Sequence, residues 1–94
     1  MRYHVEVKRS AQRDLARLPA RVREDVARAL DGLAENPRPG APAGKPLKGY
    51  PGLWRLRVAG SYRVVYRLDE RAGMVRVRLI GHRRDVYRDL RPDL

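Results

Sequence analysis

One short segment carries a histidine, two arginines and a tyrosine close together. It reads Gly-His-Arg-Arg-Asp-Val-Tyr over residues 81–87 and follows three runs that carry arginine at alternating positions. Guanidinium groups bind phosphate oxygens through a planar fork of donors and stay protonated, while a phenol or an imidazole can move a proton. This combination is what phosphodiester cleavage without a metal ion requires. It also suits a surface that only binds RNA.

The charge of the chain favours a polyanionic partner. Its 94 residues include 22 Lys and Arg against 11 Asp and Glu, which gives a formal net charge of +11. The excess is uneven, because residues 1–36 carry eight basic and six acidic side chains whereas residues 37–94 carry fourteen and five. Each neutralised phosphate releases counterions, so we expect the anion to bind the second half of the chain.

Composition also excludes several classes of protein. There is no cysteine, and the two histidines lie far apart in sequence, so we expect no disulfide, no metal site and no cofactor. No apolar run approaches the length of a membrane span or a signal peptide. We therefore expect one small cytoplasmic domain over residues 1–94 that does not contact a membrane.

Hydrophobic periodicity predicts an α+β fold made of a strand, two helices and three further strands. Pro19 separates the two helices, which form an αα-hairpin packed on one face of the sheet. Short turns join the last three strands into an antiparallel meander. The expected elements are a strand over 2–8, helices over 11–18 and 20–35, a loop over Asn36–Pro46, and strands over Leu53–Val58, Tyr62–Leu68 and Met74–Ile80.

Alternation within these three strands separates two sets of side chains. One set, which includes Trp54, Tyr66 and Leu79, should pack against the helices, and the other should lie on the open face of the sheet. Like charges on adjacent strands repel, so a row of arginines without an interleaved acid favours an anion site over an ordinary solvated surface. Six arginines are expected in this row: Arg55, Arg57, Arg63, Arg67, Arg76 and Arg78.

The order of these elements resembles that of the RelE/ParE toxin superfamily of bacterial and archaeal toxin–antitoxin pairs. The resemblance covers nearly the whole chain and is carried by Pro46–Gly49, Leu53–Arg57, Tyr62–Tyr66 and Gly81–Tyr87. It is closer to the RelE branch, which cleaves messenger RNA in the ribosomal A site, than to the gyrase-poisoning ParE branch. The resemblance implies messenger RNA on the 70S ribosome as the substrate and a RelB-like antitoxin as the protein partner.

The resemblance also implies which residues act. The RelE branch has basic residues where Arg55 and Arg57 stand, although lysine is the familiar residue at both positions. Because an arginine does not accept a proton in practice, proton transfer would fall to Tyr87, to His82 or to solvent, and only Tyr87 has a precedent in the family. The implied catalytic residues are Arg55, Arg57, Arg63, Arg83 and Tyr87. The side chains expected to bind RNA are Lys45, Lys48, Arg67, Arg76, Arg78, His82 and Arg84.

Other interpretations stay open at this point. The chain could poison DNA gyrase, or it could be a module that binds RNA or the ribosome without activity. Arg63, Arg83 and Tyr87 favour the nuclease, whereas arginine in place of lysine keeps the inactive module open. At the level of single residues, Tyr87 could be a buried ring and His82 a surface residue beside a turn.

Overall fold

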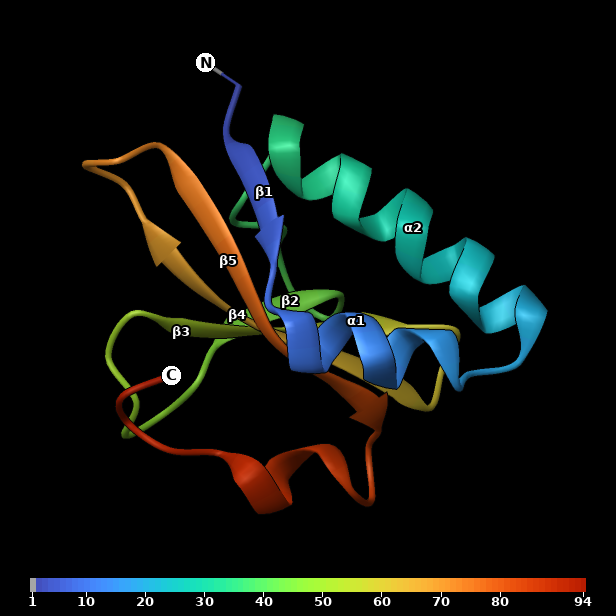
Figure 1. Ribbon diagram of the computed structural model, residues 1–94. Coiled ribbons are helices and arrows are strands. Elements are labelled where there is room, and N and C mark those ends of the chain that lie inside the picture. The colour runs from blue at the N-terminus through green and yellow to red at the C-terminus, as the bar shows by residue number, and fades with distance from the viewer. Residues whose placement is uncertain (1) are drawn as a thin grey trace.

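The computed structural model describes residues 2–94 and has a five-stranded sheet with two helices on one face (Figure 1). The strands lie in the order β1-β5-β4-β3-β2. The predicted α+β class and the helical hairpin are confirmed. The elements are β1 (His4–Val7), α1 (Arg9–Ala16), α2 (Ala20–Glu35), β2 (Gly44–Pro46), β3 (Leu53–Val58), β4 (Tyr62–Asp69), β5 (Met74–His82) and the 3-10 turn η1 (Val86–Asp89).

The first strand closes one edge of the sheet. β1 runs parallel to β5, with His4 opposite Met74 and Val7 opposite Val77, and the two helices make the long connection that parallel pairing needs. Every other neighbouring pair of strands is antiparallel. β1 therefore covers only the first half of β5, and the remainder of β5 extends past it toward the C-terminal segment.

The sequence prediction missed one strand. The loop expected over Asn36–Pro46 contains β2, which pairs with β3 so that Lys45 lies opposite Arg55. Three residues that include a glycine and a proline show no alternation, so nothing in the local pattern marks them as a strand. Pairing with the edge of β3 forms this strand, and it brings Lys45 beside the arginines of the sheet.

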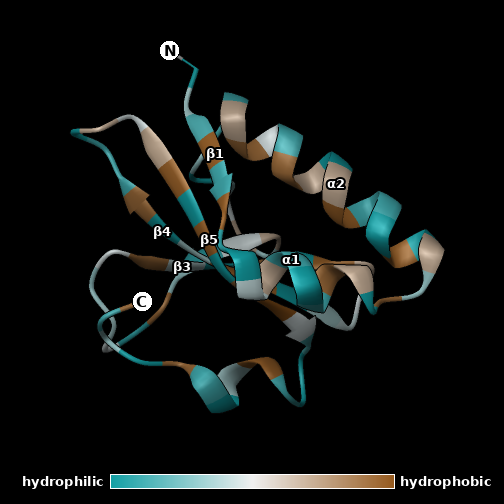
Figure 2. Cartoon of the chain, viewed as in Figure 1, coloured by the Kyte–Doolittle hydropathy of each residue, from teal (hydrophilic) through white to brown (hydrophobic). Residues whose placement is uncertain are grey.

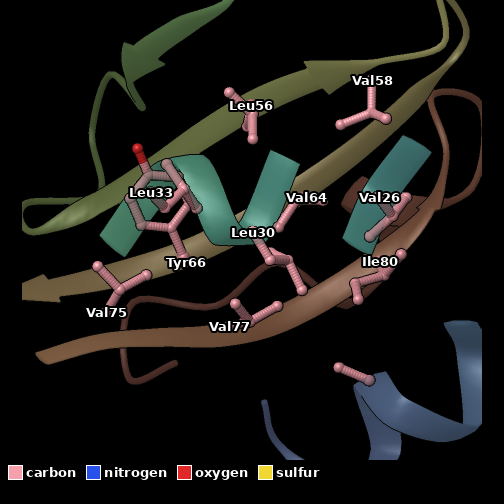
Figure 3. Close-up of a cluster of buried hydrophobic side chains, with 11 residues drawn as sticks. Val26, Leu30, Leu33, Leu56, Val58, Val64, Tyr66, Val75, Val77 and Ile80 are labelled. Carbon is pink, nitrogen blue, oxygen red and sulfur yellow. The ribbon is translucent and has the colours of Figure 1, made fainter. Parts of the chain in front are cut away.

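The main core lies between the helices and the sheet. Apolar side chains of α2 meet those of β3, β4 and β5 in one layer (Figure 3), and the hydropathy of α2 alternates along the helix as expected for an amphipathic helix (Figure 2). Tyr66 is fully buried in this layer, and its hydroxyl donates a hydrogen bond of 2.8 Å to the carbonyl oxygen of Pro37. Neither helix in residues 2–94 has the length and apolar composition needed to cross a membrane.

A β-bulge changes the end of β5. Val65 lies opposite Leu79 and Tyr66 opposite Val77, so Arg78 is the extra residue between them. The bulge reverses the alternation beyond this point, and Ile80 enters the core with 3% of its surface exposed. The prediction that Leu79 lies on the core face is therefore wrong.

The face of the sheet opposite the helices is not fully open. The C-terminal segment, residues 83–94, turns back beneath the sheet (Figure 1), and the Nη2 of Arg67 donates to the carbonyl oxygen of Pro92 at 2.9 Å. Leu53 and Val65 on this face are completely buried. The predicted row of six exposed arginines is wrong for this reason, because the chain itself covers part of the face.

Candidate functional site

Side chains from four parts of the chain line a shallow, open depression on this second face. Its volume is about 670 Å³, and we call it the basic hollow. Five of the lining side chains are cationic, one is aliphatic and one is a phenol, and no carboxylate lines it. The lining residues are Lys45, Leu47, Arg55, Arg63, Arg83, Arg84 and Tyr87.

The sheet brings the first cations of the hollow together. Lys45, Arg55 and Val65 occupy one row across β2, β3 and β4, so their side chains leave the same face. The Nη1 of Arg55 donates to the carbonyl oxygens of Pro42 at 3.0 Å and Ala43 at 3.4 Å. These bonds fix the guanidinium at the edge of the hollow.

The surroundings of Arg55 also affect the pKa of its guanidinium. Burial is the main cause that lowers the pKa of its guanidinium below the ordinary value; Tyr87 acts in the opposite direction, and the positive charges of Arg63 and Arg57 lower it further. A guanidinium nevertheless keeps its proton in a folded protein. Arg55 can therefore stabilise negative charge in the hollow, but it cannot accept a proton there.

Arg63 is the most buried of these cations, with 8% of its surface exposed. Its Nη1 donates to the carbonyl oxygens of Gly60 and Tyr62, both at 2.9 Å. Gly60 lies in the β3–β4 turn, where Ala59 and Gly60 both have positive φ, and Tyr62 is the first residue of β4. Arg63 thus stabilises the turn as well as lining the hollow, which the alternation pattern alone did not indicate.

The end of β5 supplies the other side of the hollow. The amide of Arg83 donates to the carbonyl oxygen of Ser61 at 2.8 Å, which ties this segment to the β3–β4 turn. The chain then turns and enters η1, where Tyr87 is 37% exposed. The alternative that Tyr87 is a buried ring is therefore wrong, because its phenol is accessible from the hollow.

Several predicted RNA-binding residues lie outside the hollow and have other contacts. Arg76 pairs with Asp69 at 2.8 Å and with Glu6 at 4.0 Å, so the expectation of no acid among these arginines is wrong. Glu6 stands opposite Arg76 because β1 pairs with β5, a register that the local pattern does not encode. Arg67 binds the C-terminal segment, and the Nε of Arg78 is buried without a hydrogen-bond partner.

The remaining predicted residues also lie elsewhere. Arg57 lines a smaller depression of about 340 Å³ with Pro42, Ala43 and Gly60. The ring of His82 packs edge-to-face against Tyr62, with ring centroids 5.4 Å apart. Lys48 is exposed and does not line the basic hollow.

Sequence reasoning missed Leu47, the one aliphatic side chain of the hollow. It follows β2, and its amide donates to the carbonyl oxygen of Leu53 at 2.9 Å. The only signal for it was its place in the Pro46–Gly49 segment beside Lys45 and Lys48. Within residues 2–94, no three His, Cys, Asp or Glu side chains come together in a way that could hold a metal ion.

Comparisons with known proteins agree on one family. A family model described as the ParE toxin of the type II toxin–antitoxin system, parDE, matches residues 5–87. Toxin RelG of Mycobacterium tuberculosis is 36% identical over 90 residues, which cover 94% of this chain and 99% of that protein. Toxin RelE of the same organism is 38% identical over 88 residues, which cover 92% of this chain and 87% of that protein.

Solved structures give the same result. The toxin–antitoxin complex RelBE2 from Mycobacterium tuberculosis contains a chain with a TM-score of 0.73 and 33% identity, over 88% of this chain and 100% of that chain. A mutant of Escherichia coli toxin RelE in the free state has a TM-score of 0.75 and 28% identity, over 87% of this chain and 84% of that chain.

Proposed function

Because the chain belongs to the RelE/ParE family of type II toxin–antitoxin toxins, we propose that it is an endoribonuclease that cleaves messenger RNA in the ribosomal A site without a metal ion. The observation that carries the proposal is the composition of the basic hollow, in which five cations and an accessible phenol meet and no carboxylate lines the surface. Such a surface suits a phosphodiester whose charge increases during reaction.

The proposed reaction begins with the ribose 2′-hydroxyl of the RNA. Its oxygen attacks the adjacent phosphorus in line, the bond to the 5′-oxygen breaks, and the products carry a 2′,3′-cyclic phosphate and a 5′-hydroxyl. The phosphorane-like oxygens gain negative charge on the way, and Arg63 and Arg83 offer guanidinium donors for them. Only the Nη1 of Arg63 donates to the carbonyl oxygens of Gly60 and Tyr62, so its other nitrogens can bind phosphate.

Proton transfer is the second requirement of this reaction. Four of the five cations of the hollow are arginines, which keep their proton, and Leu47 is aliphatic. Of the two remaining side chains, Lys45 and Tyr87, only Tyr87 stands where the RelE branch has a precedent, and we assign it the transfer of the 2′-hydroxyl proton. Arg55 lies close enough to Tyr87 for the two side chains to interact electrostatically. Lys45 and Arg84 complete the set that would hold the neighbouring phosphates.

A RelB-like antitoxin is the proposed protein partner. The related chain of Mycobacterium tuberculosis is found in a toxin–antitoxin complex, and so is Escherichia coli RelE. The net charge of +11 favours an acidic partner that neutralises part of this surface. Co-expression with the protein encoded beside this one should yield a stable complex and relieve growth arrest. A toxin that stays free and active beside that protein would contradict the pairing.

Primer extension on messenger RNA in a purified translation system, with and without ribosomes, tests the activity. We expect cleavage within the A-site codon only when ribosomes are present. Arg83→Ala and Tyr87→Phe should each abolish it, since one removes a phosphate-binding charge and the other the phenol. Arg88→Ala is the matched control, because Arg88 is exposed, pairs with Asp85 at 3.4 Å and does not line the hollow. Intact message with unaffected translation would contradict the proposal.

A second candidate function is inhibition of DNA gyrase, because the matching family model is described as the ParE toxin. This activity would need a protein–protein surface and none of the catalytic residues. A supercoiling assay distinguishes the two, because a gyrase inhibitor would block supercoiling and retain its effect in Tyr87→Phe. The names of the two curated relatives, both of the Rel type, favour the nuclease.

A further inference from the structure

We propose that His82 is a positioning residue, whose uncharged ring holds the turn that carries Arg83 and Arg84 into the basic hollow. The consequence for RNA rests on the function proposed above, whereas the structural role of the ring does not. The proposal takes His82 out of the set of RNA-binding residues and gives it a contact with the main chain instead.

The turn after β5 is held by three backbone donors, and His82 receives two of them. The amide of Arg83 donates to Ser61, and the amide of Asp85 donates to the carbonyl oxygen of His82 at 2.9 Å. The amide between them, that of Arg84, donates to the Nδ1 atom of the His82 ring at 3.2 Å. The ring therefore supplies the one acceptor of this turn that can be lost by taking up a proton.

The ring lies on the other side of the turn from the basic hollow. It packs on Tyr62 and lines a separate depression of about 400 Å³ between α1, β5 and η1. Arg83 and Arg84 line the basic hollow, so the turn separates the ring from the charges that it positions. The charged and titratable groups around this depression are Asp14 of α1, Arg17 just after α1, Tyr62 of β4, Asp85 of the turn and Asp89 of η1. Arg84 is bonded to the ring through its amide.

Protonation of the ring would break its bond with the Arg84 amide and attract the ring to nearby carboxylates. Nδ1 can accept the Arg84 amide only while it has a free lone pair, so the proton must sit on Nε2. An imidazolium donates from both nitrogens, loses this bond and is attracted by the carboxylates of Asp14, Asp85 and Asp89. Protonation of the ring should therefore loosen Arg83 and Arg84 and weaken their hold on phosphate.

The structural test follows the Arg84 amide by NMR and hydrogen exchange between about pH 5 and 8. In the wild type the amide signal should follow the titration of the His82 ring, and its protection should fall about tenfold at the acidic end, as expected for one lost hydrogen bond. His82→Asn keeps a side-chain acceptor two residues before the amide and does not titrate, so its protection should be independent of pH. His82→Ala should be unprotected at every pH.

Two results would overturn this role. One is an Arg84 amide that is equally protected in His82→Ala and in the wild type. The other is a wild-type pH dependence that persists in His82→Asn; this comparison stands even if the alanine variant does not fold. Tyr62→Phe is the matched control, because it keeps the ring contact with His82 and should behave as the wild type.

The functional test measures binding of a 2′-O-methyl hexanucleotide, which cannot be cleaved, by fluorescence anisotropy. Wild-type affinity should fall about threefold or more from pH 8 to pH 5, whereas His82→Asn should bind equally at both. This direction is diagnostic, since protonation of a histidine near a cationic site would by charge alone strengthen binding. The same pH dependence in both proteins would overturn the proposal. If the wild type did not cleave message in primer extension, the proposed function would be wrong, but the role of His82 at the Arg84 amide would not be affected.

Discussion

At the scale of single residues, the arginines divide into those that line the hollow and those that stabilise the fold. Arg83 and Arg84 are exposed and available to an anion, whereas Arg67 and Arg76 are bonded to the protein. Arg63 belongs to both groups, because it lines the hollow and binds the carbonyls of the β3–β4 turn. The alternation of residue types placed Arg63 on the correct face, but its burial of 92% was not predictable from that alternation.

Arg63 therefore leads to a prediction that differs from that for Arg83. Arg63→Ala removes the Nη1 atom that donates two partly buried hydrogen bonds. The free energy of unfolding should fall by about 1–3 kcal/mol, and cleavage should be abolished. Arg83→Ala should abolish cleavage with stability unchanged within about 0.5 kcal/mol, because its side chain is exposed. Urea unfolding of both variants measures this. Equal stability of the two would show that the turn bonds contribute nothing.

At the scale of elements, the C-terminal segment matters most to the shape of the site. Arg67 of β4 donates to main-chain oxygens of Pro92 and Leu94, and more weakly to Pro51 at 3.4 Å. The φ of Gly52 is +85°, which favours glycine, and a Cβ atom there would also lie 2.6 Å from the Nη1 of Arg67, so the guanidinium would have to move. The guanidinium thus joins the segment after η1 to the loop before β3.

Removal of this guanidinium should release the C-terminal segment. In Arg67→Ala, we expect faster hydrogen exchange and earlier proteolytic cleavage within residues 90–94, because two charge-assisted bonds are lost. Limited proteolysis followed by mass spectrometry measures it. Arg71→Ala is the control, as Arg71 is an exposed arginine in the β4–β5 turn. Identical cleavage in both variants would mean that other contacts hold the segment.

The end of β4 carries a carboxylate, that of Asp69, whose contribution to stability depends on pH. Asp69 accepts hydrogen bonds from the Nη1 of Arg76 at 2.8 Å and from the amide of Ala72 at 3.1 Å, and these bonds lower the pKa of its carboxyl below the ordinary 3.8. A carboxyl whose pKa is lower in the folded than in the unfolded chain stabilises the fold above its ordinary value. That stabilisation is lost as the pH falls through the lower, folded value.

Asp69→Asn should accordingly melt below the wild type at neutral pH. Asparagine keeps the bond from Ala72 but loses the ion pair with Arg76, so the difference in Tm reports the carboxylate. The two melting temperatures should converge as the pH falls below 3.8. Thermal unfolding at a series of pH values checks this. A difference that persists unchanged at acid pH would show that the charge of Asp69 does not cause it.

At the scale of the whole molecule, the sheet separates two surfaces. The helices cover one face and the C-terminal segment lies beneath the other (Figure 1). The main core lies on the helical face, and the basic hollow lies on the opposite face. A titration of RNA binding with salt should therefore show how much of the affinity comes from contacts between the hollow and phosphates.

Salt dependence of RNA binding should reveal how many phosphates the hollow neutralises. If it contacts about three phosphates, the logarithm of the binding constant should fall with the logarithm of salt concentration with a slope of about −2. Arg83→Ala should reduce the magnitude of this slope by about 0.7. Arg9→Ala, an exposed change on α1, should leave it unchanged. Equal slopes for all three proteins would mean that the hollow does not bind the RNA backbone.

The sequence by itself determined the local elements and the excess of positive charge. Periods of 3.6 and 2 residues arise from the geometry of each segment alone, so both helices, the strands β3 and β4 and the arginine-bearing face could be predicted. The cluster of Arg55, Arg63, Arg83 and Tyr87 was also expected, through the family resemblance.

Only the tertiary structure decided which of these side chains stay free. The bulge at Arg78, the strand β2, the pairing of Glu6 with Arg76 and the return of the C-terminal segment all depend on contacts between residues far apart in sequence. Such contacts follow from register and chain reversal, which a local pattern of residue types does not contain. They turn a predicted row of six exposed arginines into one compact hollow.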